Sequence, residues 1–148
     1  MTPDLETANP LDVRVRLSAL WITTMFIVAF VDLFGLYRAD VREQIESGQI
    51  LNFDIGQGFM LGIIVYILVP TLMIAASILL PRRVNQIANI TVASIFAITV
   101  VGAAIGEWAY YLLASAVELA LLAVIIVTSW RWLRATKAGA DRRDAVSV

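Results

Sequence analysis

Residues 55–81 read IGQGFMLGIIVYILVPTLMIAASILLP, a run of 27 residues without a charge. Two arginines, Arg82 and Arg83, separate it from a second uncharged run of 23 residues at 84–106. A helix that crosses a bilayer needs about 20 mostly apolar residues, so each run is long enough to span a membrane. We therefore interpret the chain as an integral membrane protein.

Two further apolar stretches flank this pair. Leu17–Tyr37 and Trp108–Trp130 each contain one charged residue, Asp32 and Glu118 respectively. Because unsatisfied backbone groups are costly in lipid, apolar stretches of this length cross membranes as helices. We expect an all-α fold, a transmembrane four-helix bundle with up-down-up-down topology. It would be a single membrane domain of residues 1–148, with spans at 17–37, 57–80, 85–106 and 108–131.

The basic residues predict an orientation. Of the 11 Lys and Arg residues, nine lie at the end that holds both termini and the connection between the second and third spans. The other end has only Arg38 and Arg42. Because cytoplasmic connections carry an excess of Lys and Arg, both termini are predicted to be cytoplasmic, in tails at 1–16 and 132–148.

Two absent residue types exclude several functions. The chain has no Cys and no His. Thiolate nucleophiles and iron–sulfur clusters need Cys, and the usual ligands of haem and catalytic zinc include His. No group of Asp and Glu has the spacing of a calcium loop. We predict no metal site, no cofactor and no nucleic-acid partner, so that the lipid bilayer is the expected partner.

The connection after the first span is long enough to hold structure. Ala39–Ser47 places Val41 and Ile45 on one helical face, and Gly48 follows as a natural stop. We expect a short amphipathic helix on the membrane surface in this first external loop. Aromatic residues near the predicted span ends are interpreted as interface anchors, among them Trp21, Tyr37, Trp108, Trp130 and Trp132.

Small residues mark positions where helices can pack closely. Gly58 and Gly62 form one Gly-x-x-x-Gly pair, and Gly102 and Gly106 form another. Faces of this kind let helix backbones approach each other in lipid. Packing within one bundle is the main interpretation, and self-association into a homo-oligomer is the alternative. Pro70 lies inside the second span and predicts a kink there.

Two acids inside the spans give the main indication of function. A charged side chain at the centre of a span costs about 2.5–3.5 kcal/mol on insertion scales, and such residues face a bundle interior or a wet cavity. With a rise of about 1.5 Å per residue, Asp32, Glu118, Tyr66 and Thr99 all lie roughly 20–24 Å from the basic end. We expect them to form one inward-facing polar layer. The candidate ligand- or proton-binding residues are Glu118, Asp32, Tyr66, Thr99 and Asn89.

Several functions are compatible with this layer. We favour a non-enzymatic protein, in which the layer either only fixes helix register or binds a lipid-like or other hydrophobic small molecule. One alternative is a membrane-embedded enzyme that uses a buried, protonated carboxyl group as general acid or base on a lipid-like substrate. The other is an oligomeric proton-coupled transporter, with Glu118 as the carrier.

Short motifs also give the chain a resemblance to a known family. They are LSALW at 17–21 followed by Met25-Phe26 and Asp32, QGF at 57–59 with Pro70, Asn85 with ANI at 88–90, and Tyr110-Tyr111 before Glu118. Over residues 15–132 the chain resembles a family of small bacterial four-span integral membrane proteins of unknown function. The resemblance implies the four-span fold and a place in the bacterial inner membrane. It implies no reaction.

Overall fold

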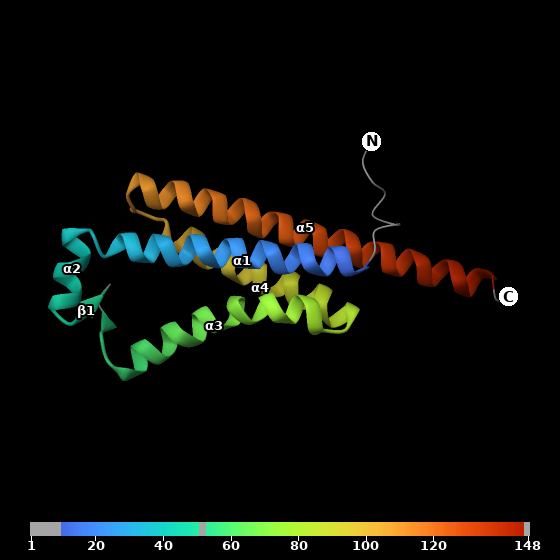
Figure 1. The fold of residues 1–148 in the computed structure, drawn as a ribbon, viewed down its shortest axis with the longest axis horizontal. Helices are drawn as coiled ribbons and strands as arrows, with labels where there is room; N and C mark the ends of the chain where they lie inside the picture. Colours follow the sequence, from blue (N-terminus) through green and yellow to red (C-terminus); the bar gives the residue numbers. More distant parts are fainter. Residues whose placement is uncertain (1–9, 51–52, 147–148) are drawn as a thin grey trace.

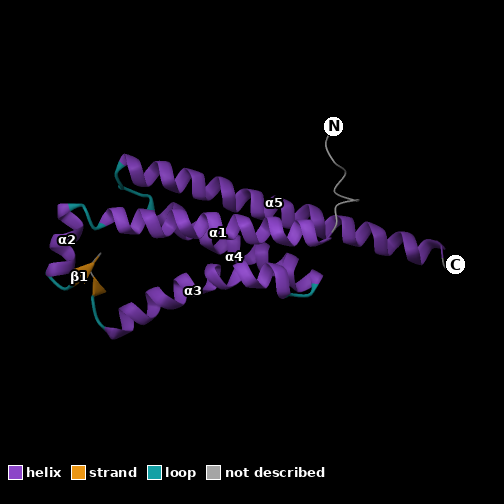
Figure 2. Ribbon diagram, viewed as in Figure 1, coloured by secondary structure: helices purple, strands orange, loops and turns teal. Residues whose placement is uncertain are grey.

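A computed structural model describes residues 10–50 and 53–146, with side chains described for 13–50 and 53–134, and most of the chain is helical (Figure 2). The long helices are α1 (Pro10–Gly35), α3 (Gln57–Leu79), α4 (Arg82–Ala103) and α5 (Ala109–Val146). Each contains a segment long and apolar enough to cross a membrane. Between α1 and α3 lie the short helix α2 (Ala39–Glu46) and the paired strands β1 (Gln49–Ile50) and β2 (Phe53–Asp54).

The four long helices alternate in direction (Figure 1). Helix α1 packs against α3 and α5, and α4 packs against the same two helices. The all-α fold with four long apolar helices, and the short helix between the first two, are therefore confirmed. The two-residue strands were not predicted, and they pair antiparallel with Gln49 opposite Asp54.

Two helices extend beyond their predicted spans. Helix α1 begins at Pro10, inside the region predicted as the N-terminal tail, and α5 continues to Val146 through most of the C-terminal one. Proline suits the first position of a helix, because its fixed φ angle is helical and it has no N–H to satisfy. Once a helix has formed, adding a turn is far easier than starting one. The apolar runs thus set the span lengths but not the helix ends.

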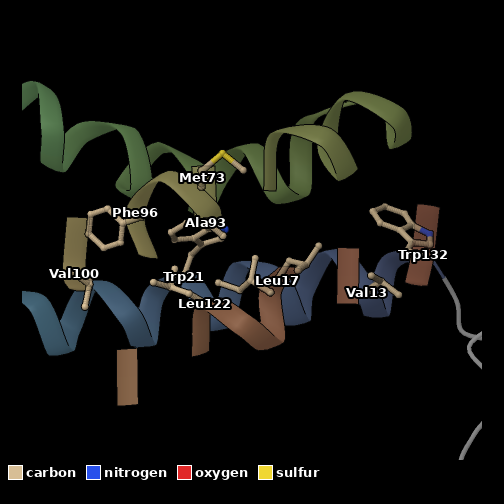
Figure 3. Close-up of a cluster of buried hydrophobic side chains, with 10 residues drawn as sticks. Val13, Leu17, Trp21, Met73, Ala93, Phe96, Val100, Leu122 and Trp132 are labelled. Atoms are coloured by element: carbon tan, nitrogen blue, oxygen red, sulfur yellow. The ribbon is translucent and has the colours of Figure 1, made fainter. Parts of the chain in front are cut away.

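The buried side chains form one cluster in which the long helices meet (Figure 3). Val13, Leu17 and Trp21 follow one another at four-residue spacing along the inner face of α1. Trp21 is fully buried and lies beside Ala93 of α4, whose small side chain leaves room for the indole ring (Figure 3). The prediction that Trp21 anchors the membrane interface is therefore wrong. Trp132 is also buried, with 5% of its surface exposed.

The two glycine pairs have no close neighbour in the described part of the chain. A Cβ atom added at Gly58, Gly62, Gly102 or Gly106 would meet no neighbouring atom within 4 Å among the described residues. The close approach that glycines permit needs an opposing helix, and no described residue lies that close to these four positions. Their role in helix packing stays a prediction. Gly106 instead adopts φ +83° in the turn between α4 and α5, a conformation that favours glycine.

Helix α3 has two unlike halves. Its buried residues are Pro70, Met73 and Ser77, all in the second half, and its first half buries none. In Figure 1 the first half runs obliquely away from α1, and the second half lies along it. Pro70 lies inside α3, at the start of its buried half, and cannot donate the backbone hydrogen bond that would reach Tyr66 four residues earlier. Pro70 thus separates a half of α3 that contains buried residues from a half that contains none.

Arg38 connects the start of α2 to the turn between α4 and α5. Its guanidinium forms ion pairs with Asp40, at 2.6 Å, and with Glu107 in the turn before α5. It also lies over the Trp108 ring, 4.6 Å from the centroid. The hydrogen bond from Arg38 holds the pKa of the Asp40 carboxyl below its ordinary range. These contacts hold the start of α2 against the α4–α5 turn.

Candidate functional site

Tyr66 and Thr99 are brought together between α3 and α4. The two hydroxyl oxygens are 2.7 Å apart, and the Thr99 hydroxyl donates to the Phe96 carbonyl at 2.7 Å. Because threonine has a single hydroxyl hydrogen, Tyr66 is the donor in the bond between them. The Tyr66 ring stacks on Phe96, with centroids 5.2 Å apart. The Tyr66 hydroxyl is therefore fixed in place and can still accept a hydrogen bond.

The two acids of the spans differ in exposure. Glu118 is buried, with 5% of its surface exposed. Asp32 is exposed in the isolated chain, and the buried position of α1 at this level is its neighbour Val31. The expectation that Asp32 faces inward is thus wrong in part. Since neighbouring residues on a helix point about 100° apart, Asp32 lies at the edge of the inner face of α1 that Val31 marks.

Asp32, Tyr66, Tyr111 and Glu118 form what we call the acid–tyrosine cluster. Glu118 and Asp32 lie close enough for their carboxyl groups to influence each other, and both lie within the same electrostatic reach of the Tyr66 and Tyr111 hydroxyls, with Glu107 also within reach of Tyr111. Among the described residues, no Lys or Arg contributes to these interactions. The cluster therefore combines two carboxyl groups and two phenols without a basic partner.

The cluster draws on three helices and has an open side. Asp32 comes from α1, Tyr66 from α3, and Tyr111 and Glu118 from α5. Tyr66 is 41% exposed although its hydroxyl is bonded. Asp32 and Tyr66 are thus the exposed members, and Glu118 is the buried one. In a bilayer, a molecule in the acyl-chain region would meet Asp32 and Tyr66 first.

Tyr111 was absent from the predicted site residues. It precedes Ser115 and Glu118 at spacings of four and three residues, so the three share one face of α5. The structure leaves Tyr111 half-buried and buries both Ser115 and Glu118. Because Tyr111 shares this face with Glu118, the spacing could have been used to include Tyr111 among the predicted site residues.

Asn89 lies in a different network. Its Oδ1 accepts from Trp21 Nε1 at 2.7 Å and from the Ser77 hydroxyl at 3.3 Å, and its Nδ2 donates to the Asn85 carbonyl and to Asn85 Oδ1. These four bonds use every donor and acceptor of the amide. Asn89 is ten residues from Thr99 on α4, about 15 Å along the axis. The structure thus gives Asn89 a position in the core, away from the acid–tyrosine cluster.

The side chains of the cluster can form hydrogen bonds and exchange protons. No three carboxylates among the described residues lie close enough together to hold a metal ion. The two phenols and two carboxyl groups can each donate or accept, depending on protonation. The site is suited to binding a polar group inside an apolar surround.

Four helices long and apolar enough to cross a membrane define the class of this chain as a multi-span membrane protein. Residues 11–139 match the model of a family of unknown function, DUF6326. The chain belongs to this family. No curated protein and no solved structure matches it. The resemblance to a family of unknown function is thereby confirmed, and the comparisons supply no activity.

Proposed function

We propose that this protein binds a hydrophobic small molecule with a polar head group, which it holds at the acid–tyrosine cluster inside the membrane. The proposal is supported by two acids inside the spans, Asp32 and Glu118, because no described Lys or Arg forms an ion pair with either of them. Keeping such groups in a span costs about 2.5–3.5 kcal/mol each. A ligand that donates hydrogen bonds, or that carries a positive charge, would offset this cost.

The exposure pattern supports entry from the lipid. Asp32 and Tyr66 are both exposed, and the side chains of α3 around Tyr66 are mostly apolar and exposed as well. An amphiphile can approach through the bilayer without crossing an aqueous interface. Its head group would reach Tyr66 and Asp32 first and Glu118 last.

The decisive experiment is mass spectrometry of the protein purified in mild detergent. We expect a small molecule to co-purify with the unaltered protein and to be lost from Glu118→Gln. Glu46→Gln is the matched control, because Glu46 is an exposed acid on α2. Thermal stability in detergent is measured in parallel to show that Glu118→Gln remains folded.

The outcomes separate the candidate functions. Equal retention of the ligand by Glu118→Gln and Glu46→Gln would contradict the proposal. If no molecule co-purifies and Glu118→Gln only lowers stability, the cluster fixes helix register. Chemical conversion of the bound molecule that stops in Glu118→Gln would favour the enzyme. Proton-dependent flux in liposomes that stops in the same variant would favour the transporter.

We also propose that the four helices form a bundle in the bacterial inner membrane, with both termini in the cytoplasm. The support is the distribution of basic residues. Arg14, Arg16, Arg82, Arg83 and Arg131 lie at the end that α1 and α4 start from, whereas Arg38 and Arg42 lie at the other. An excess of this kind is typical of the cytoplasmic side.

A further inference from the structure

Three hollows follow one another along the outer surface where α1 packs against α5. Their volumes are about 600, 390 and 490 Å³, from the α2 end to the end that holds the termini. The first two share Phe34 and Tyr110, and the second and third share Thr23. They therefore adjoin, and we call the continuous depression the α1–α5 seam.

The hollow nearest the termini combines an apolar wall with two arginines. Leu20 of α1 and Val124 and Val127 of α5 line it, and Arg16 and Arg131 complete it at the end near the termini. Both arginines are exposed. A long apolar trough that ends at two guanidinium groups matches the two parts of a phospholipid.

The charges at this end of the molecule are not balanced. Among the side chains that the structure describes, both ion pairs involve Arg38, at the opposite end. Of the arginines near the termini, Arg14 donates to the Ile78 carbonyl at 2.9 Å, and Arg82 and Arg134 lie over tryptophan rings. No described carboxylate pairs with Arg16 or Arg131. An anion placed between them would meet no described competitor.

We propose that the α1–α5 seam binds an anionic phospholipid. Its phosphate lies between Arg16 and Arg131, and one acyl chain lies in the hollow behind them. From Arg16 to Phe26 on α1 is ten residues, or about 15 Å, which is half of the roughly 30 Å hydrocarbon core. The seam thus offers one leaflet's depth of apolar surface, which a free phosphate would leave unused.

This site is separate from the acid–tyrosine cluster and does not depend on it. Basic pockets between membrane helices are known binding sites for anionic head groups. The hollow distinguishes Arg16 and Arg131 from Arg83, which is exposed at the same end but lines none of the three hollows. The hollow also predicts that the lipid is held, rather than only attracted to the surface.

The test is native mass spectrometry of the full chain in detergent, titrated with phosphatidylglycerol or with phosphatidylcholine of the same acyl chains. We expect a preference for phosphatidylglycerol that falls about tenfold or more in the double variant Arg16→Gln, Arg131→Gln. The control is Arg83→Gln, Arg134→Gln, which removes the same charge from the same end outside the hollow. It should change the affinity by less than about threefold.

A second variant tests the hollow without changing charge. Ala19 lines it and is exposed, so Ala19→Trp fills the space while keeping an apolar surface toward lipid. We expect it to weaken phosphatidylglycerol binding as well. Equal losses in the two arginine double variants, no preference over phosphatidylcholine, or equally tight binding of glycerol phosphate alone would each overturn the proposal. Unchanged binding by Ala19→Trp would overturn it too.

Discussion

The side-chain amide of Asn89 joins three helices. Through Trp21 it reaches α1, through Ser77 it reaches α3, and through Asn85 it stays bonded along its own helix α4. Asn85 adds a bond from its Nδ2 to the Ser77 carbonyl at 2.5 Å. All four residues are fully buried. In lipid, where burial of apolar surface does not drive helices together, hydrogen bonds of this kind help to fix which helices meet.

The bond between Trp21 and Asn89 can be measured with a double-mutant cycle. We expect Trp21→Phe and Asn89→Leu to lower the free energy of unfolding, with a coupling of about 0.5–2 kcal/mol between them. The coupling energy separates the loss of the hydrogen bond from the loss of packing that the smaller phenylalanine ring causes. The measurement is reversible unfolding in mixed detergent micelles.

The control for this cycle is Trp130, which is 48% exposed and lies beside Arg134. A cycle of Trp130→Phe with Asn89→Leu should show coupling near zero, because the two side chains share no contact in the structure. Coupling of similar size in both cycles would show that Trp21 and Asn89 interact only through general loss of packing.

At the scale of elements, Pro70 makes α3 testable as two segments. We expect Pro70→Ala to restore the backbone bond to Tyr66, to straighten α3 and to bring its first half closer to α1. The measurement is the distance between spin labels on Leu36→Cys and Met60→Cys in lipid nanodiscs. The chain has no native Cys, so both labels attach at single defined sites.

Labels at the packed end provide the comparison. Val15 and Ile78 are both exposed and lie near the contact between Arg14 and the Ile78 carbonyl. The distance between labels on Val15→Cys and Ile78→Cys should not change with Pro70→Ala. An unchanged distance between the labels at 36 and 60 would mean that something other than Pro70 holds the first half of α3 away.

The helices could be predicted from the sequence, but the positions of their buried faces could be predicted only in part. The length of the apolar stretches gives four spans, two without a charge and two with a single acid each, because a chain crosses lipid as long apolar helices. In a membrane helix, however, apolar side chains face both lipid and neighbour, so hydrophobicity does not mark the inner face. For this reason the sequence did not predict that the first half of α3 has no buried residues, and Trp21 was wrongly predicted to lie at the membrane interface.

The candidate site, too, could be predicted only in part. The level of each residue follows from a fixed rise per residue, and Tyr66 and Thr99 do lie together. The direction in which each side chain points around the helix axis does not follow in this way, because a shift of one position turns the side chain by about 100°. That step separates the buried Val31 from the exposed Asp32. The full set of bonds at Asn89 depends on three helices meeting, which no single helix pattern contains.

At the scale of the whole molecule, the proposed orientation can be checked by labelling. Single cysteines replace Glu46 on α2 and Arg83 at the start of α4, which are exposed and lie at opposite ends. In intact cells, a membrane-impermeable maleimide should label Glu46→Cys at once and Arg83→Cys only after permeabilisation. The reverse pattern would show that the orientation is the opposite of the one proposed. Labelling of both variants in intact cells would contradict the four-span topology.

Helix α5 has a mechanical consequence. It has 38 residues, so it is about 57 Å long, nearly twice the roughly 30 Å hydrocarbon thickness. Beyond Arg134 it continues for 12 residues to Val146, and Figure 1 shows this part projecting past the other helices. Because α5 is one continuous helix, a tilt of a few degrees within the lipid would swing its far tip by several ångströms.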